Sequence, residues 1–335
     1  MNNPNQRITP DRDRFSGCLI GQCVGDAIGF AVEGFSPAAC QRYIEDFLKT
    51  GKVGEFGRFP FPFGQYSDDS QLARELMQSY VDRRQFDPAD YAERIRLIFA
   101  EKRIVAFGYS TKEAVKRLVL GASWEESGTP APSAGNGSAM RAAPVGLFFF
   151  DNPQMLIRAA HDQGRITHKD PRCSAGAIAI SGAVVLALRG EKIDVGTFIS
   201  TLADWTNDME AGFSSALEKL EGWLSMPPGE AAGMISGAGF DPDYIDDEEW
   251  KGHREHGGIG GVDSGRIDIC WVYLQSVECN VWAEGPGRRP RYTAQDRLRP
   301  DGPGVAGRRA RRADPRQPTL GRDGDPHLRV HENGR

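Results

Sequence analysis

The sequence predicts an all-α fold, and three observations support this. Apolar residues recur at spacings of three and four from about residue 12 to residue 275, no run of residues alternates as a strand would, and clusters of turn residues separate the periodic stretches. The hydrophobic fraction of 39% over 335 residues is sufficient for a core. The clearest amphipathic stretches cover residues 70–83, 88–102, 110–121, 153–164, 195–206 and 211–225.

The most apolar stretch, Ser174–Leu188, predicts a buried helix rather than a membrane span, because a span needs about 20 apolar residues. The N-terminal segment lacks the apolar centre of a signal peptide, and the six cysteines form neither a CxxC pair nor a cluster with histidine. We therefore expect a cytoplasmic protein without a membrane partner. The net charge of −5 also argues against general binding to nucleic acid or to an acidic membrane.

The composition changes near residue 284, which predicts a helical domain over 12–284 and a tail over 285–335. The tail contains 13 Arg, 5 Asp and 1 Glu, a net charge of +7, which leaves −12 for the preceding residues. Its lack of apolar periodicity predicts disorder. Binding to nucleic acid is the weaker interpretation of this basic tail, because it has no Lys and no pattern of interleaved aromatic residues. We favour the interpretation that this stretch is not an evolved protein segment, because Arg, Gly, Pro, Ala and Asp are the residues that a GC-rich gene yields in the wrong reading frame.

The first candidate motif is GCLIGQCVGDAIGFAVEG, residues 17–34. Its glycines recur every four residues, so they form a groove along one helix face against which another segment is expected to pack closely. Asp26 and Glu33 are seven residues apart, so they point the same way, about 10 Å apart, if the helix continues. The alternative is tight helix packing with two solvated acids.

The second motif places Ser67, Asp68 and Asp69 directly before a strongly amphipathic helix. One interpretation is an ordinary helix cap, since Ser and Asp accept hydrogen bonds from the first amides and negative charge suits the helix dipole. The other is a metal site. Three adjacent oxygen ligands exceed what capping needs, and hard oxygen donors suit Mg²⁺ or Ca²⁺.

The third motif is GNGSAMRAAPVGLFF, residues 135–149. Its small residues allow a ligand to approach the backbone, and Ser138 at a helix start can present amides to a phosphate. Arg141 can pair with an anion or with a buried carboxylate. The alternative is a plain loop followed by a helix with Pro144 near its first turns.

The fourth motif, THKDPR, places His168 just before Asp170 and Pro171, which start the most buried helix of the chain. A lone histidine in such a position is either a structural residue or a hydrogen-bond partner for a ligand at the helix mouth. The residues alone leave both interpretations open.

The four motifs in this order, GDAIG…E, YSDDS, GNGSAMRAAPVGL and THKDPR, resemble the ADP-ribosylglycohydrolase family, which includes the enzyme that reactivates dinitrogenase reductase. The resemblance covers roughly residues 13–276. It includes VDS at 262–264 and WVYLQS at 271–276, which is similar to the penultimate helix of the family.

The resemblance implies an all-α orthogonal multi-helix bundle that cleaves an ADP-ribosyl glycosidic bond with a binuclear Mg²⁺ centre. It implies that Ser67, Asp68 and Asp69 are metal ligands, that Asp26 supports them, and that Glu33 and Asp69 are the catalytic residues. In such an enzyme the metal ions orient the ribose hydroxyls and prepare a water molecule, while a carboxylate accepts its proton. The residues implied to line the ADP-ribose pocket are Asn136, Gly137, Ser138, Met140, Arg141 and His168.

One family motif is missing. The remaining metal ligands of the family come from a GGDxDT motif about 20 residues after the WVYLQS helix, and no GGDxDT occurs in this sequence. We interpret this as a frame disruption between roughly Arg266 and Glu284, and we expect weak Mg²⁺ binding and poor hydrolysis. The alternatives are a non-catalytic ADP-ribose binder, a structural helical protein, or another Mg²⁺-dependent hydrolase such as a phosphoesterase. The residues fix neither the linkage cleaved nor the oligomeric state.

Overall fold

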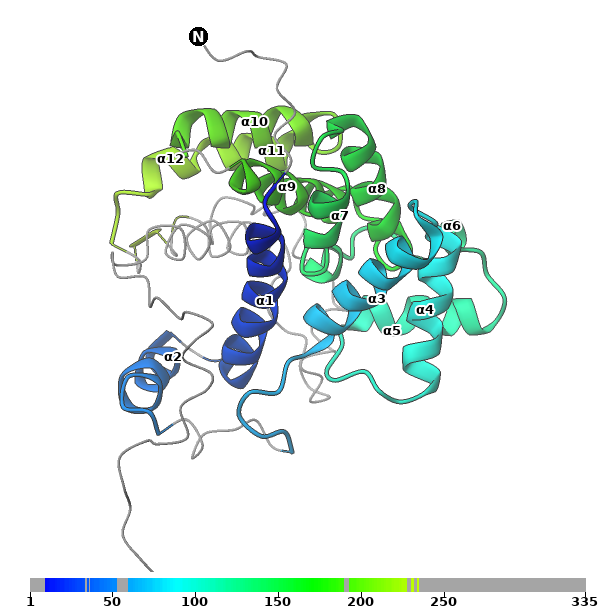
Figure 1. Cartoon of the computed structure of the whole chain (residues 1–335), viewed down its shortest axis with the longest axis horizontal. Helices are drawn as coiled ribbons and strands as arrows, with labels where there is room; N and C mark the ends of the chain where they lie inside the picture. Colours follow the sequence, from blue (N-terminus) through cyan, green and yellow to red (C-terminus); the bar gives the residue numbers. More distant parts are fainter. Residues whose placement is uncertain are drawn as a thin grey trace, which may run out of the picture. The chain divides into compact units, whose positions relative to one another are not determined.

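The computed structural model describes residues 10–33, 35, 37–52, 60–189, 193–227, 230, 231 and 234. All regular elements in these ranges are helical, and Thr129 and His168 form an isolated parallel β-bridge. The all-α prediction is therefore confirmed (Figure 1). The VDS and WVYLQS segments and the basic tail lie outside the described residues, so their assignments and the boundary at 284 remain predictions.

The elements follow one another in a simple order. They are α1 (Arg12–Gly29), a 3₁₀ turn (Phe30–Val32), α2 (Pro37–Arg42), a π-helical turn (Tyr43–Leu48), α3 (Asp68–Arg83), α4 (Pro88–Ala100), α5 (Tyr109–Val119), α6 (Trp124–Ser127), a 3₁₀ turn (Asn136–Ser138), α7 (Ala143–Phe148), α8 (Pro153–Arg165), α9 (Pro171–Leu188), α10 (Val195–Asn207), α11 (Ala211–Glu218) and α12 (Leu220–Trp223).

Most of these helices begin where a polar side chain accepts hydrogen bonds from the first amides. Proline follows the cap in α4, α8 and α9, where its fixed φ suits the first turn and its missing N–H costs no helix hydrogen bond. Pro144 is the second residue of α7 and so lies in its first turn, which agrees with the alternative interpretation of the third motif as a loop followed by a helix. The capping residues are Asp11 for α1, Ser67 for α3, Asp87 for α4, Asn152 for α8, Asp170 for α9, Asp194 for α10 and Glu210 for α11.

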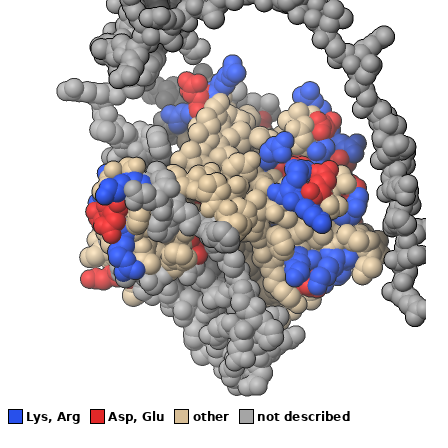
Figure 2. Space-filling model, turned by 90° about the horizontal axis from the view of Figure 1, so that it is seen from below, with Lys and Arg blue, Asp and Glu red and all other residues tan. Residues whose placement is uncertain are grey.

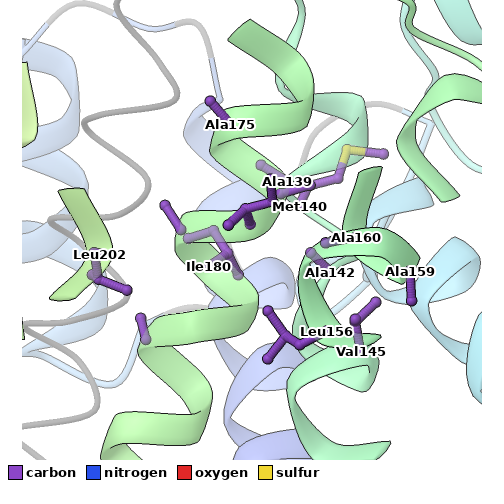
Figure 3. Close-up of a cluster of buried hydrophobic side chains, with 14 of the residues drawn as sticks. Ala139, Met140, Ala142, Val145, Leu156, Ala159, Ala160, Ala175, Ile180 and Leu202 are labelled. Carbon is purple, nitrogen blue, oxygen red and sulfur yellow. The ribbon is translucent and has the colours of Figure 1, made fainter. Parts of the chain in front are cut away.

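Helix α9 is the centre of the core, as the apolar run predicted. It contacts α7, α8, α10 and α11, and its buried residues are mainly Ala, Gly, Ser, Ile and Val. The side chains that meet around it come from α7, α8, α9, α10 and the turn before α7 (Figure 3). Small residues permit close approach: a Cβ on Gly182 would lie 2.8 Å from Leu202 Cδ2 and 3.0 Å from Trp205 Cε3.

The expectation of one helix over residues 211–225 was wrong in detail. The helix breaks after Glu218, so that Lys219 separates α11 from the short α12. Leu217, Leu220 and Trp223 are nevertheless all buried in the same core cluster. Periodicity alone did not distinguish a broken helix from a continuous one, because the apolar face continues across the break.

The expected packing of a segment against the glycine groove of α1 is not found among the described residues. A Cβ added at Gly17, Gly21 or Gly29 would meet no described atom within 4 Å. The helix also exposes large apolar side chains, with Ile20 at 62% and Val24 at 41% exposure.

Within the part of the chain that the structure describes, two helical stretches are long and apolar enough to cross a membrane by length and composition, Arg12–Val32 and Pro171–Leu188. The second is the largely buried core helix, in agreement with the prediction from its sequence. In the first, Asp26 is buried and takes part in the polar network described below.

Charges of both signs are intermixed on the surface. On the face shown in Figure 2, the described Lys, Arg, Asp and Glu residues stand together at the margins of a broad uncharged area. Between α3 and α4, Arg94 pairs with Asp82 and Arg83 pairs with Asp90, and within α4 Arg94 also pairs with Asp90. Pairs at the surface such as Arg94–Asp82 contribute about 0–1 kcal/mol.

Two glycine substitutions should have opposite effects on stability. A Cβ on Gly146 in α7 would overlap the carbonyl oxygen of Ser181 and lie 2.9 Å from Val184 Cβ, so Gly146→Ala should destabilise the protein by about 1–3 kcal/mol. Gly17→Ala meets no described atom within 4 Å and should stabilise it by roughly 0.5–1 kcal/mol. Urea denaturation measures both, and a destabilising Gly17→Ala would contradict the open environment of α1.

Candidate functional site

The site is built around a link between α1 and the start of α3. The Asp26 carboxylate accepts hydrogen bonds from the Ser67 amide at 3.0 and 2.9 Å, from Ser67 Oγ at 2.8 Å and from the Ser70 amide at 3.1 Å. Asp26 and Ser67 are both buried. Asp26 therefore caps α3 from another helix and fixes the position of the residues that begin it.

Four carboxylates gather at this link. Burial raises the pKa of Asp68 well above its usual range, and Asp69, Glu33 and Asp26 raise it further in that order. Burial also raises the pKa of Asp69, as do Asp26 and Glu33, while the Ser67 hydroxyl opposes the shift. Such crowding of like charges is unfavourable without a counter-ion.

The expected geometry of Asp26 and Glu33 required one helix to continue through both residues, and it does not. Both carboxylates nevertheless lie near Asp68 and Asp69. Helix α1 ends at Gly29, and a 3₁₀ turn then leads to Glu33, whose backbone is extended at φ −54° and ψ 127°. The seven-residue helical spacing does not apply. Glu33 is exposed, whereas Asp26 is buried.

The donors at this site fit a hard divalent cation in their chemical type. Carboxylate oxygens of Asp68, Asp69 and Glu33 and the hydroxyl of Ser67 are the ligands that Mg²⁺ accepts. The described residues, however, form no group of three or more His, Cys, Asp or Glu side chains arranged to hold a metal ion. These side chains therefore fit such an ion in chemical type only, and their assignment as magnesium ligands remains a prediction.

The loop before α7 is bonded to α1, and its Arg141 lies near the start of α3. Gln22 on α1 donates a hydrogen bond to the Met140 carbonyl at 2.9 Å, and the Met140 amide bonds to the Asn136 carbonyl at 3.0 Å. Arg141 is near enough to Asp68 for the two charges to interact. The structure therefore brings together the three segments predicted to form the site.

Arg141 is completely buried, and its donors are largely used within the protein. Its Nε donates to Gln163 Oε1 at 2.8 Å, and Nη2 donates to the Gln163 carbonyl at 2.9 Å and to Thr167 Oγ1 at 2.8 Å. The guanidinium lies 5.5 Å from the centre of the Tyr91 ring. Its Nη1 has no hydrogen-bond partner. The side chain of Arg141 thus faces the interior. Its contact with a ligand, which the family resemblance implies, remains a prediction.

His168 packs against the glycines of the loop. A Cβ on Gly137 would overlap His168 Cε1 and lie 3.0 Å from Nε2, so this glycine is required by the position of the ring. Burial lowers the pKa of His168 to about 3, assisted by Arg141, and the imidazole is therefore neutral near pH 7.

The other predicted pocket residues differ in accessibility. Asn136 is half-buried, whereas Gly137, Ser138 and Met140 are buried. The Ser138 hydroxyl donates to the Cys173 carbonyl at 2.7 Å, which joins the loop to the first turn of α9. Their contacts with a ligand remain predictions.

Sequence reasoning missed Gln22, Gln163 and Thr167. Gln163 and Thr167 hold Arg141, and each had a signal in the sequence. Gln163 is a polar residue on the buried face of an amphipathic helix, following Ala159 and Ala160 by helical spacing. Thr167 adjoins His168 within the fourth motif.

A groove of about 370 Å³ lies at the other end of α3, lined mainly by Arg84, Phe86, Phe148, Phe149, Met155 and Arg158. Since α3 has 16 residues, this groove is about 24 Å from Asp68. The acids of the candidate site do not line it.

Comparison with known proteins finds a matching family over most of the chain. The model of the ADP-ribosylglycohydrolase family matches residues 8–248. The chain is 31% identical to "ADP-ribosylhydrolase ARH3" from Gallus gallus over 216 residues, 61% of this chain and 58% of that protein. It is 30% identical to "ADP-ribosyl-[dinitrogen reductase] glycohydrolase" from Rhodospirillum rubrum over 177 residues, 51% of this chain and 57% of that protein.

A solved structure described as an "ADP-ribosylglycohydrolase-related protein complex" superposes with a TM-score of 0.54 at 26% identity, covering 82% of this chain and 90% of that one. The chain spans somewhat more than half the length of the curated relatives that it matches. Since the family model covers well over half of its residues and includes all four motifs, this chain belongs to the ADP-ribosylglycohydrolase family.

Proposed function

We propose that this chain derives from a magnesium-dependent hydrolase that cleaves an ADP-ribosyl glycosidic bond. The observation that carries the proposal is the attachment of the Asp68–Asp69 pair to α1 through Asp26, beside the loop that carries Asn136. This arrangement places acidic oxygen ligands next to a small-residue loop, which suits a metal-assisted reaction on a phosphate-containing substrate.

Each residue has a defined role in this proposal. Ser67, Asp68 and Asp69 would hold Mg²⁺, and Asp26 keeps them in place through its bonds to Ser67 and Ser70. The chemistry that Mg²⁺ would supply there is orientation of the ribose hydroxyls and a lower pKa for a water molecule. Asp69 or Glu33 accepts the proton of that water; Glu33 is the exposed carboxylate and therefore the one that meets the substrate from outside.

The substrate class follows from the relatives. The name of the Rhodospirillum rubrum relative describes a glycohydrolase that acts on ADP-ribosyl-dinitrogen reductase. We propose that the present chain recognises the ADP-ribose part of such a substrate through Asn136, Gly137 and His168. Positive charge develops on the anomeric carbon as a glycosidic bond breaks, and the nearby carboxylates favour that charge.

We further propose that this chain hydrolyses its substrate slowly. Its 335 residues contain no GGDxDT motif, from which the remaining metal ligands of the family come. A dication with half of its ligands binds weakly. Retention of ADP-ribose binding without turnover is the second candidate function, since the loop and His168 do not depend on those missing ligands.

Replacement of Asp68 should raise the stability of the protein and lower its affinity for Mg²⁺. Asp68→Asn removes a buried charge opposed by three neighbouring carboxylates, so the metal-free variant should melt at a higher temperature. A gain of about 1 kcal/mol corresponds to roughly 2–4 °C in a domain of this size. The same variant should lose Mg²⁺ affinity, measured by isothermal titration calorimetry.

Asp82→Asn on the same helix is the matched control. Asp82 is exposed, and its carboxylate pairs with Arg94 and accepts a hydrogen bond from Gln78 at the surface. Its replacement should change stability by less than about 1 kcal/mol and leave Mg²⁺ binding unchanged. Equal Mg²⁺ affinities for the Asp68→Asn and Asp82→Asn proteins would show that Asp68 is not a ligand.

The chain should bind ADP-ribose and yet hydrolyse ADP-ribosyl substrates slowly. We expect the purified chain to bind ADP-ribose with and without Mg²⁺, and to cleave ADP-ribosyl-arginine or ADP-ribosyl-serine at least about 100-fold more slowly than a complete relative. Even the outer partners of metal ligands contribute about 10–100-fold. Calorimetry and a release assay measure the two properties. Full Mg²⁺-dependent cleavage would refute the proposed deficiency, and phosphate release that ADP-ribose does not inhibit would indicate a phosphoesterase.

A further inference from the structure

We propose that Arg141 and Thr167 are positioning residues that fix the tautomer of His168, so that its Nε2–H serves as the hydrogen-bond donor beside the loop 135–137. The identity of the acceptor rests on the proposed function: a phosphoryl or hydroxyl oxygen of ADP-ribose. The tautomer itself rests only on the hydrogen bonds of the protein.

The first step concerns Arg141, which is a donor and never an acceptor. Its Nη2 lies 2.8 Å from Thr167 Oγ1, so the threonine hydroxyl accepts this hydrogen bond. Both residues are 0% exposed, and no water competes for the contact. The rest of the guanidinium is fixed through Gln163, by Nε to its side chain at 2.8 Å and by Nη2 to its carbonyl at 2.9 Å.

The second step concerns the hydrogen of the Thr167 hydroxyl. Two acceptors are within reach: His168 Nδ1 at 2.8 Å and the Gly164 carbonyl at 3.5 Å. The shorter contact has the ordinary length of a strong hydrogen bond, whereas 3.5 Å is too long for one. The hydroxyl therefore accepts from Arg141 and donates to Nδ1, so Nδ1 carries no proton.

The third step concerns the other ring nitrogen. A neutral imidazole carries one N–H, and the threonine occupies Nδ1 as an acceptor, so the proton is on Nε2. Nε2 faces the loop: a Cβ would lie 3.2 Å from it at Gly135 and 3.0 Å from it at Gly137. At both positions the absence of a side chain leaves the donor uncovered.

The last step concerns the accessibility of Nε2. It makes no hydrogen bond among the described residues, yet it is not among their buried side-chain atoms that lack a partner, such as Arg141 Nη1. The small exposed part of His168, 3% of the residue, therefore includes this nitrogen. An uncovered donor without a protein partner is available to an acceptor atom of a ligand.

This arrangement changes the role assigned to Arg141 by family resemblance. Instead of touching the ligand, it acts on the ligand through two intervening side chains. His168 presents a single donor of fixed identity, which favours an acceptor such as a phosphoryl oxygen and disfavours a ligand N–H at the same place.

The test is nitrogen NMR of the full chain labelled with ¹⁵N in its histidine imidazoles, with the His168 signals assigned by their loss in His168→Gln. We expect Nδ1 of the wild-type protein to be unprotonated and Nε2 to carry the proton. In Thr167→Val the tautomer should become mixed or reverse, and the Kd for ADP-ribose should rise about tenfold, which is about 1.4 kcal/mol. Thr167→Ser should retain both properties.

Thr206→Val is the matched control, because Thr206 is equally buried and bonds only to carbonyls of its own helix. A proton on Nδ1 in the wild-type protein would overturn the inference. So would a Thr167→Val protein with the wild-type tautomer and the affinity of the Thr206→Val control. If the expected tautomer is found but the wild-type chain does not bind ADP-ribose, the positioning role is supported and the proposed function fails.

Discussion

The carboxylate of Asp26 organises the site. It receives the Ser67 amide and hydroxyl and the Ser70 amide, which are the polar groups that the start of α3 leaves without helical partners. This cap comes from another helix, 41 residues away in sequence, and it does more than satisfy the free amides of α3. It also fixes the position of Asp68 and Asp69 relative to α1, and so keeps close together negative charges that repel one another.

A second network secures the other wall. Buried Arg141 joins α8 to the segment that carries Thr167 and His168, and the Ser138 hydroxyl joins the loop to α9. A buried guanidinium is costly unless its donors find acceptors. Here two side chains and one carbonyl accept from Nε and Nη2, whereas Nη1 has no partner among the described residues. The position of the glycine loop is therefore tied to the hydrogen bonds of the interior.

Much of the fold could be predicted from local pattern. The helix at Asp68–Arg83 was visible both in its periodicity and in the cap at Ser67. The break at Lys219 was not visible, because the apolar stripe of α11 continues through α12. The site shows the same division. Residue types and family resemblance pointed to Asp68 and His168 as candidates, and their roles remain predictions. The inward direction of Arg141 depends on tertiary contacts with Gln163 that no spacing encodes.

The shallow setting of α1 has a consequence for local dynamics. Among its described residues only Asp26 is fully buried, whereas α9 is buried along most of its length. Elements with few buried contacts open at lower free energy than the global transition. Fraying or detachment of α1 would therefore move Asp26 away from Asp68 and Asp69 while α7 to α11 stay folded. Amide hydrogen exchange would then show two separate cooperative units. In such a protein, loss of function on warming precedes loss of the fold.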